Sequence, residues 1–391
     1  MTREIRVQGT VADGYEAVRE EFTAVLANEL PEYEGQLAAH VRGRRVVDLW
    51  VGPDVTGESL YGVFSSTKGA AHLVVALLVQ DGVLDLDRVV AAYWPEFAAE
   101  GKGAVTLREL LAHRAGVAGP DVGFSPEELA DDRAIAARLA AQRPWWRPGS
   151  AFGYHAFSIG ALAGEVVFRA TGRTLREVYE ERVRAPYGLD FFLGLPEEHE
   201  KRFRSVQPMA PTPEQAALLD AEPAQPHTFN ALAFNRHAAE PTDLEAAPNS
   251  RLLRAEGNAS IGGVASARGL AGMYAAAVTG LGGREALLTP DTIAAFGQVQ
   301  SVGHDLVAGA FKAFAVGFQA TSVAVYPFLG AGTIGHSGVA GSQAFADPRS
   351  GLAYGYTRRR FAYPGGPAFE NERLVRAIHE AAIAAGRAGH A

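Results

Sequence analysis

The chain contains no cysteine, which excludes disulfide bonds, thiolate nucleophiles and cysteine-ligated zinc. It has no run of basic residues and carries a formal charge of −8, so a nucleic-acid partner is not expected. No apolar stretch approaches the roughly 20 residues of a membrane span, and the N-terminal sequence MTREIRVQGTVADG lacks the apolar core of a signal peptide. These absences predict a cytoplasmic protein with no membrane partner.

Metal-binding motifs are also missing. The eleven histidines form no His-Glu-x-x-His pair, and the nearest attempt, His379-Glu380, continues with Ala-Ala-Ile. We therefore expect neither a metal nor another cofactor.

Lysine is scarce, since only four of the 36 basic residues are lysines, at positions 68, 102, 201 and 312. An arginine stays protonated at working pH, whereas a desolvated lysine loses its proton. A lysine in an apolar stretch is therefore a candidate base, and Lys68 is followed by the apolar sequence GAAHLVVALLV.

Helical periodicity dominates the middle of the chain, and strand-like runs lie near both ends. Helices are expected over 14–29, 65–82, 106–116, 125–142, 155–172, 174–188 and 367–385. Strands are expected over 36–43, 44–52, 313–321, 332–338, 341–348 and 352–359. The pattern predicts an α+β (α/β) fold in which one antiparallel sheet is built from both chain ends and flanked by helices.

Two domains follow from this division. Residues 1–62 and 258–391 would form the α/β domain, and residues 63–257 a mainly helical insertion. Within the insertion, residues 207–257 are rich in Pro, Ala and Asn, and the segment is too long for a simple connector. We expect this irregular region to lie over the site.

The octapeptide FSSTKGAA, residues 64–71, opens the expected helix with two serines and a lysine. Residues three apart share a helix face, so Ser65 rather than Ser66 faces Lys68. The first helical turn also offers free backbone N–H groups to a developing anion. Alone, this Ser-x-x-Lys pattern favours a serine that caps a helix beside a solvated lysine, and only the further motifs shift the balance toward a nucleophile.

Tyr154 and a glycine-rich strand end supply two further candidates. Tyr154 lies in GYHAFSIGALAGEV, at the start of an apolar helix. It could act as a phenol base or a hydrogen-bond relay, or it could simply be a half-buried core residue. In GTIGHSGVAGSQ, the run His336-Ser337-Gly338 ends a strand, and we expect it to bind polar groups of the substrate. The N–H of the next residue, Val339, would be available to an oxyanion. The sequence GHSGV lacks the last glycine of the Gly-x-Ser-x-Gly elbow, which argues against an α/β-hydrolase.

Taken together, these motifs resemble the serine β-lactamase and penicillin-recognising superfamily, and most of all its class C-like family VIII carboxylesterases. The resemblance runs in order through FSSTK, LRELLAHRAG, PG-x-x-x-GYH, SIGGVASARGLA and HSG, over about residues 35–385. It implies a catalytic serine at Ser65, with Lys68 and Tyr154 shuttling protons. It also implies an oxyanion hole from the N–H groups of Ser65 and Val339.

Two departures from class C β-lactamases favour esters over β-lactams. Ala156 stands where those enzymes carry an asparagine, and His336-Ser337-Gly338 replaces Lys-Thr-Gly. The resemblance therefore implies a serine carboxylesterase acting on small esters with short or medium acyl chains. An amidase, peptidase, acyltransferase or weak β-lactamase using the same acyl-enzyme is the alternative, and a non-catalytic binding protein on this scaffold a further one.

Aromatic residues near Tyr154 are candidates for the walls of the substrate pocket, or else for the core: Trp145, Trp146 and Phe152. Phe64 is expected to pack beneath the serine, and His113, Ser260 and Ser266 to be structural. The sequence leaves the oligomeric state open.

Overall fold

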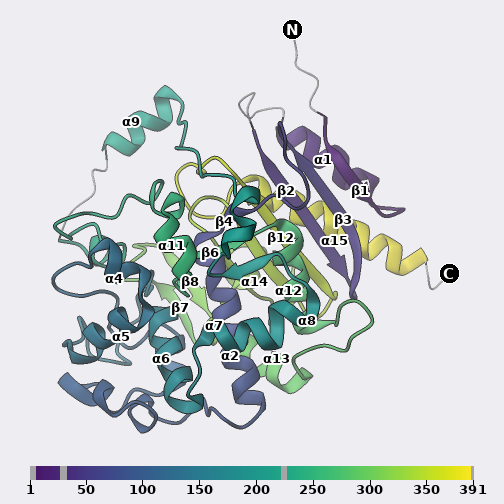
Figure 1. The fold of residues 1–391 in the computed structure, drawn as a ribbon. Helices are drawn as coiled ribbons and strands as arrows, with labels where there is room; N and C mark the ends of the chain where they lie inside the picture. Colours follow the sequence, from purple (N-terminus) through teal and green to yellow (C-terminus); the bar gives the residue numbers. More distant parts are fainter. Residues whose placement is uncertain (1–5, 27–32, 222–226, 389–391) are drawn as a thin grey trace.

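The computed structural model describes residues 6–26, 33–221 and 227–388, so residues 27–29 of the first expected helix lie outside it. Its centre is a nine-stranded antiparallel sheet with the strand order β1-β3-β2-β12-β11-β10-β9-β8-β7 (Figure 1). The strands are β1 (Gln8–Val11), β2 (Gly35–Val41), β3 (Arg44–Val51), β7 (Ser301–His304), β8 (Phe311–Phe314), β9 (Gln319–Ala320), β10 (Ile334–Ser337), β11 (Gln343–Asp347) and β12 (Leu352–Arg358).

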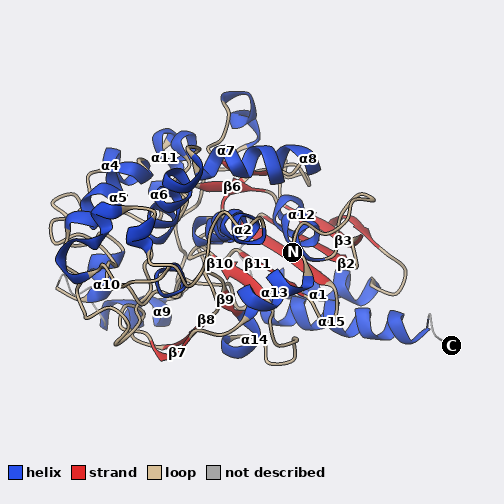
Figure 2. Cartoon of the chain, turned by 90° about the horizontal axis from the view of Figure 1, so that it is seen from below, coloured by secondary structure: helices blue, strands red, loops and turns tan. Residues whose placement is uncertain are grey.

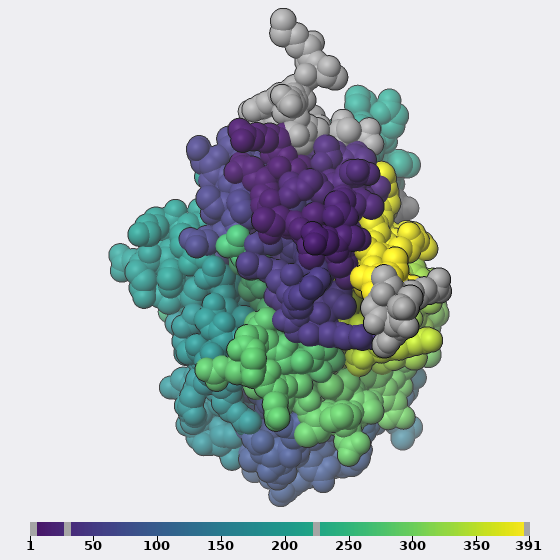
Figure 3. Space-filling model, turned by 90° about the vertical axis from the view of Figure 1, so that its right-hand side faces the viewer, coloured from purple at the N-terminus to yellow at the C-terminus, as the bar shows by residue number. Residues whose placement is uncertain are grey.

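The two ends of the chain meet inside this sheet. Strand β2 pairs with β12 in an antiparallel register that places Leu37 opposite Tyr356. Helices α1 (Glu16–Leu26) and α15 (Glu370–Ala388) pack against one another beside these strands. Figure 3 shows the N-terminal residues in purple next to the C-terminal residues in yellow on one face. The expected sheet built from both ends and flanked by helices is therefore confirmed.

Alternate residues of β12 enter two different cores, as the two-residue period of a strand requires. Tyr354 and Tyr356 pack into the core beneath α1 and α15, whereas Ala353 faces the core on the other side. Gly355 also faces that second side, where a Cβ would lie 2.5 Å from the carbonyl oxygen of Ala267. Helix α12 (Ala267–Val278) therefore approaches the sheet closely.

The remaining helices gather mainly on one side of the sheet (Figure 2). They are α2 (Thr67–Gln80), α3 (Leu107–Leu111), α4 (Pro126–Ala130), α5 (Asp132–Ala141), α6 (Ile159–Thr171), α7 (Leu175–Tyr179), α8 (Ala185–Tyr187), α9 (Pro213–Ala221), α10 (Phe229–Ala233), α11 (Arg251–Glu256), α13 (Pro290–Gly297) and α14 (Thr321–Ala324). Short 3-10 turns occur at Phe64–Ser66, Val90–Ala92, Pro95–Gly101, Glu197–Arg202 and Ala247–Asn249, and a π-helical turn at Glu180–Arg184.

Several expected helices are shorter or broken for identifiable local reasons. The helix expected over 125–142 divides at Asp131, whose extended backbone and side chain cap the start of α5. The segment 207–257, expected to be irregular, contains α9, α10 and α11. Their short length and the prolines between them explain why no helical period is visible in the sequence.

A second, three-stranded sheet joins distant parts of the chain. It has the order β4-β6-β5, formed by β4 (Tyr61–Gly62), β6 (Gly263–Ala265) and β5 (Phe191–Leu193). The division into domains at residues 62 and 258 stays a prediction. Among the helices of the described residues, none is both long and apolar enough to cross a membrane.

Candidate active site

Ser65 lies in the 3-10 turn Phe64–Ser66, which leads from β4 directly into α2. The turn begins at Phe64, whose φ of +48° places a bulky residue in the left-handed region, a conformation that costs about 1–3 kcal/mol. The main chain on either side holds this geometry, since the Val63 N–H donates to the carbonyl of Gly263 at 3.0 Å. Ser65 is thereby fixed at the very start of the helix, with 8% of its surface exposed.

Lys68 lies one turn further along and points at the same position. Its side chain is completely buried, and its Nζ lies 3.0 Å from Ser65 Oγ, within hydrogen-bond distance. The same nitrogen donates to the carbonyl oxygens of Ala156 at 2.7 Å and Ser260 at 2.9 Å. Burial holds the pKa of Lys68 well below its usual value of 10.5. The helical phase that singled out Ser65 agrees with this contact.

Ser66, the other serine, faces the sheet instead. Its Oγ donates to the carbonyl of His336 at 3.2 Å and lies 3.0 Å from Ser342 Oγ. Ser342 Oγ in turn donates to the carbonyl of Val63 at 2.9 Å. These contacts join the end of β10 to the turn that carries Ser65.

This join places two free backbone N–H groups at the site. A Cβ at Gly338 would lie 2.3 Å from the carbonyl oxygen of Val63, so only glycine permits the approach. Within the part of the chain that the structure describes, the N–H groups of Ser65 and Val339 donate no hydrogen bond to the protein. Unpaired N–H groups beside a serine hydroxyl are suited to bind an oxyanion.

The ring of Tyr154 is enclosed by aromatic and imidazole rings. It stacks on Phe314 with 5.8 Å between ring centroids, and on His336 with 5.9 Å. His113 lies edge-on at 5.2 Å. On the remaining side, Lys68 Nζ is 5.0 Å from the ring centroid. The structure therefore brings Tyr154, Lys68 and His336 together with Ser65.

Burial keeps the phenol of Tyr154 and the two imidazoles of this cluster neutral. It raises the pKa of Tyr154, although hydrogen bonding with the nearby Ser65 hydroxyl opposes the shift. The Tyr154 Oη is buried and makes no hydrogen bond of regular geometry among the described residues. Burial also lowers the pKa of His113 and of His336 well below 6.5, so both imidazoles are uncharged at neutral pH. Among residues 6–26, 33–221 and 227–388, no cluster of His, Cys, Asp or Glu is arranged to hold a metal.

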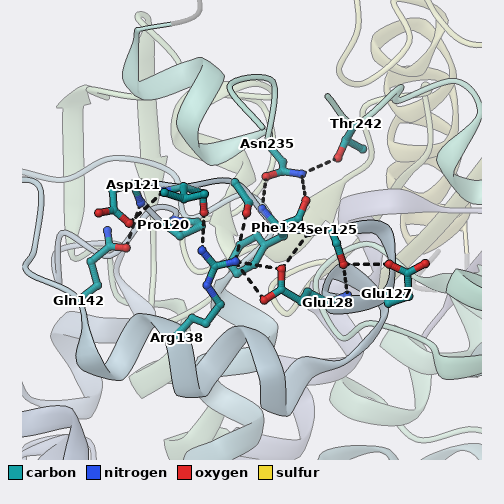
Figure 4. Close-up of polar contacts among 12 residues, drawn as sticks. Pro120, Asp121, Phe124, Ser125, Glu127, Glu128, Arg138, Gln142, Asn235 and Thr242 are labelled. Carbon is teal, nitrogen blue, oxygen red and sulfur yellow. Dashed lines mark hydrogen bonds and ion pairs between the residues drawn. The ribbon is translucent and has the colours of Figure 1, made fainter. Parts of the chain in front are cut away.

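Part of the 207–257 segment lies against Tyr154. Phe234, at the end of α10, has its ring centroid 6.4 Å from that of Tyr154. The next residue, Asn235, accepts from the Phe124 N–H at 2.8 Å and donates to the Phe124 carbonyl at 2.9 Å and to Thr242 Oγ1 at 3.0 Å (Figure 4). This side chain anchors the end of α10 to the loop before α4.

The three candidate pocket aromatics have different surroundings. Phe152 packs on Phe314, with ring centroids 6.3 Å apart, one ring removed from Tyr154. Trp146 packs on Phe229 of α10 at 5.6 Å. Trp145 is 38% exposed and lines a separate surface cavity of about 740 Å³. Phe64 packs edge-on against Phe361 at 5.8 Å, below the turn.

Sequence reasoning missed three contacts of this site. The backbone carbonyls of Ala156 and Ser260 bind Lys68. Because every residue has a carbonyl, the amino-acid sequence does not indicate which ones bind. Asp305 Oδ1 accepts from the Tyr154 N–H at 3.1 Å across 151 residues of sequence. The turn-forming residues around Asp305 predict a loop, but nothing in them points to Tyr154.

The sequence and the fold are both similar to those of known proteins. A family model described as Beta-lactamase matches residues 27–377. The chain belongs to the beta-lactamase family. It is 30% identical over 358 residues to the Esterase/beta-lactamase LipL of Mycobacterium tuberculosis (strain ATCC 25618 / H37Rv), covering 84% of this chain and 78% of LipL.

Solved structures of the beta-lactamase family agree. EstA from Arthrobacter nitroguajacolicus Rue61a matches with a TM-score of 0.89 and 42% identity, over 97% of this chain and 99% of EstA. A structure described as a family VIII carboxylesterase matches with a TM-score of 0.85 and 31% identity, over 96% and 100% of the two chains. The resemblance to family VIII carboxylesterases is confirmed, and the chain is a hydrolase of the esterase/beta-lactamase type.

The residues at the two positions where the chain differs from class C β-lactamases both contact this cluster. Ala156 has no side-chain amide, and its backbone carbonyl binds Lys68 instead. His336 is neutral and stacks on Tyr154, where a lysine would bring a positive charge.

Proposed function

We propose that the protein is a serine carboxylesterase that forms an acyl-enzyme on Ser65. The observation that carries this proposal is the hydrogen bond of 3.0 Å between Ser65 Oγ and a fully buried lysine amine. A serine hydroxyl is a weak nucleophile and needs an adjacent base. Family VIII carboxylesterases among the similar structures support ester substrates.

Lys68 is the base in this proposal. A neutral amine has two N–H groups and one lone pair. The carbonyls of Ala156 and Ser260 take up both N–H groups, which leaves the lone pair for the Ser65 hydroxyl. As Ser65 Oγ bonds to the ester carbonyl carbon, its proton passes to Lys68. The resulting oxyanion accepts from the Ser65 and Val339 N–H groups.

Tyr154 is the acid. Its raised pKa keeps the phenol protonated, so it gives its proton to the leaving alkoxide as the ester C–O bond breaks. The proton held by Lys68 then passes to the Tyr154 phenolate, which returns both groups to their starting states. Water then attacks the acyl-enzyme with the same roles: it gives its proton to Lys68, and Tyr154 protonates Ser65 Oγ as the acyl C–O bond breaks. The proton on Lys68 passes back to the Tyr154 phenolate, which restores the starting state.

Esters are favoured over β-lactams because His336 stands where class C β-lactamases carry a lysine, and it offers no positive charge to a β-lactam carboxylate. His336 is uncharged at neutral pH, and Ala156 offers no side-chain amide to a substrate amide.

The test of ester preference is a panel of p-nitrophenyl esters, an aryl amide and the cephalosporin nitrocefin. We expect kcat/KM for the acetate or butyrate ester to exceed that for nitrocefin by at least about a hundredfold. Comparable rates, or faster nitrocefin turnover, would contradict an esterase.

We further propose that Phe234 limits the length of the acyl chain. Its ring is half-buried beside Tyr154 and held by the Asn235 anchor. Phe234→Ala should raise the ratio of kcat/KM for p-nitrophenyl octanoate to that for the acetate by about tenfold, because the smaller side chain leaves room for methylene groups.

The matched control for this variant is Phe369→Ala, since Phe369 is 73% exposed. It should leave the octanoate-to-acetate ratio at the wild-type value. An unchanged ratio in Phe234→Ala would remove Phe234 from the acyl pocket.

A further inference from the structure

Asp305 begins the loop between β7 and β8, and its carboxylate is fully buried. Oδ1 accepts three backbone N–H groups, from Val307 at 2.8 Å, Ala308 at 2.7 Å and Tyr154 at 3.1 Å. Two of these three bonds close the loop itself. The third holds the residue whose ring covers Lys68.

Two neighbouring bonds reinforce this link. The Leu306 N–H donates to the carbonyl of Phe152 at 3.1 Å, two residues before Tyr154. The Asn230 side chain of α10 donates to the carbonyl of Val307 at 3.1 Å. The loop after β7 is thus bonded both to the tyrosine segment and to the helix that ends at Phe234.

Burial of a carboxylate is costly and raises the pKa of Asp305, although three backbone N–H groups and the charge of Lys312 oppose the shift. Among the described residues, Asp305 forms no ion pair within 4.0 Å. Its Oδ2 is also buried without a hydrogen-bond partner. An asparagine would accept the same three N–H groups at lower desolvation cost. Within the part of the chain that the structure describes, the bond to the Tyr154 N–H is the one hydrogen bond of this side chain that reaches beyond its own loop.

We propose that Asp305 is a positioning residue, which holds the backbone of Tyr154 so that the phenol stays between Lys68 and the leaving group. This inference rests on the proposed esterase function and extends it to a residue outside the Ser-x-x-Lys, tyrosine and His-Ser-Gly motifs. The negative charge of Asp305 acts in the same direction, because it helps to raise the pKa of Tyr154 and so favours the protonated phenol.

The informative variant is Asp305→Ser. A serine hydroxyl reaches the N–H groups of its own turn, as in an ST turn, but is too short to reach the Tyr154 N–H as well. We expect kcat for p-nitrophenyl acetate to fall by about 10- to 100-fold, with KM within threefold of wild type. Asp305→Asn retains an acceptor oxygen of the right length and should recover kcat to within about fivefold of wild type.

The matched control is Asp347→Ser. Asp347 is equally buried and also closes a turn, accepting from the Arg349 N–H at 3.0 Å and from Ser350 Oγ at 2.7 Å. It lies at the end of β11 away from Ser337, opposite the site. This variant should lower the melting temperature and leave kcat unchanged.

Wild-type turnover of p-nitrophenyl acetate and labelling of Ser65 by a fluorophosphonate test the proposed function first, independently of Asp305. Given an active wild type, normal kcat in Asp305→Ser overturns the positioning role. Equal losses in the Asp305→Ser and Asp305→Asn variants would also overturn it, because the acceptor geometry would then not matter. A lower kcat in Asp305→Ser, unchanged KM and recovery in Asp305→Asn support it.

Discussion

Ser65→Ala should lose ester turnover by at least about 10⁴-fold, and mass spectrometry should find no covalent adduct after treatment with a fluorophosphonate. The reason is that Ser65 Oγ is the hydroxyl bonded to the buried Lys68 amine. Without it the base has no proton to take, and no acyl-enzyme forms. The measurement is the intact mass of wild type and variant before and after the reagent, followed by a peptide map.

Ser66→Ala is the matched control one residue away. Its hydroxyl bonds the carbonyl of His336 and lies against Ser342 Oγ, facing the sheet. We expect the Ser66→Ala variant still to form the fluorophosphonate adduct. Its free energy of unfolding should fall by about 1–3 kcal/mol, because the buried groups that bond Ser66 Oγ lose a hydrogen bond. An adduct mapped to Ser66 in the wild type would exchange the roles of the two serines.

Lys68→Arg should lower kcat by about 10³-fold or more, although the positive charge is kept. The guanidinium does not release its proton at working pH, so it has no lone pair with which to take the Ser65 proton. In wild type, the low pKa of Lys68 means that the amine is neutral above that pKa. The rate should therefore fall on the acidic side, as pH drops through the pKa and Lys68 gains a proton.

Lys102→Arg provides the control for this charge-conserving change. Lys102 is also fully buried, and its Nζ donates to the carbonyls of Ala99 and Gln142, away from Ser65. It should leave kcat within about twofold of wild type, even where repacking lowers the melting temperature. Near-normal turnover in Lys68→Arg would show that deprotonation of this lysine is not needed.

The sequence contains enough information for the sheet and for the turn that carries Ser65. Strand alternation marks β2, β11 and β12, since each places successive residues in different cores. The three-residue spacing of Ser65 and Lys68 predicts their shared helix face, and the short 3-10 turn at the start preserves it. These features depend on local periodicity, which a sequence displays directly.

The contacts that complete the site depend on distant segments and left no local pattern. Lys68 binds two backbone carbonyls, 88 and 192 residues away. Phe234 reaches Tyr154 from a five-residue helix whose own period is too short to detect. Phe314 stacks on Tyr154 from a strand in which it reads simply as a core residue. The tertiary fold, and not the local sequence around each residue, determines which residues make these contacts.

The bond between Ser66 and His336 spans 270 residues, and β2 completes its pairing only when β12 is present. During synthesis the serine emerges from the ribosome long before the strands that fix its turn. Contacts of such high sequence separation form late in folding. We therefore expect a nascent chain that ends before His336 to hydrolyse no ester, because Ser65, the proposed nucleophile, would lack the proposed oxyanion-binding edge at Val339.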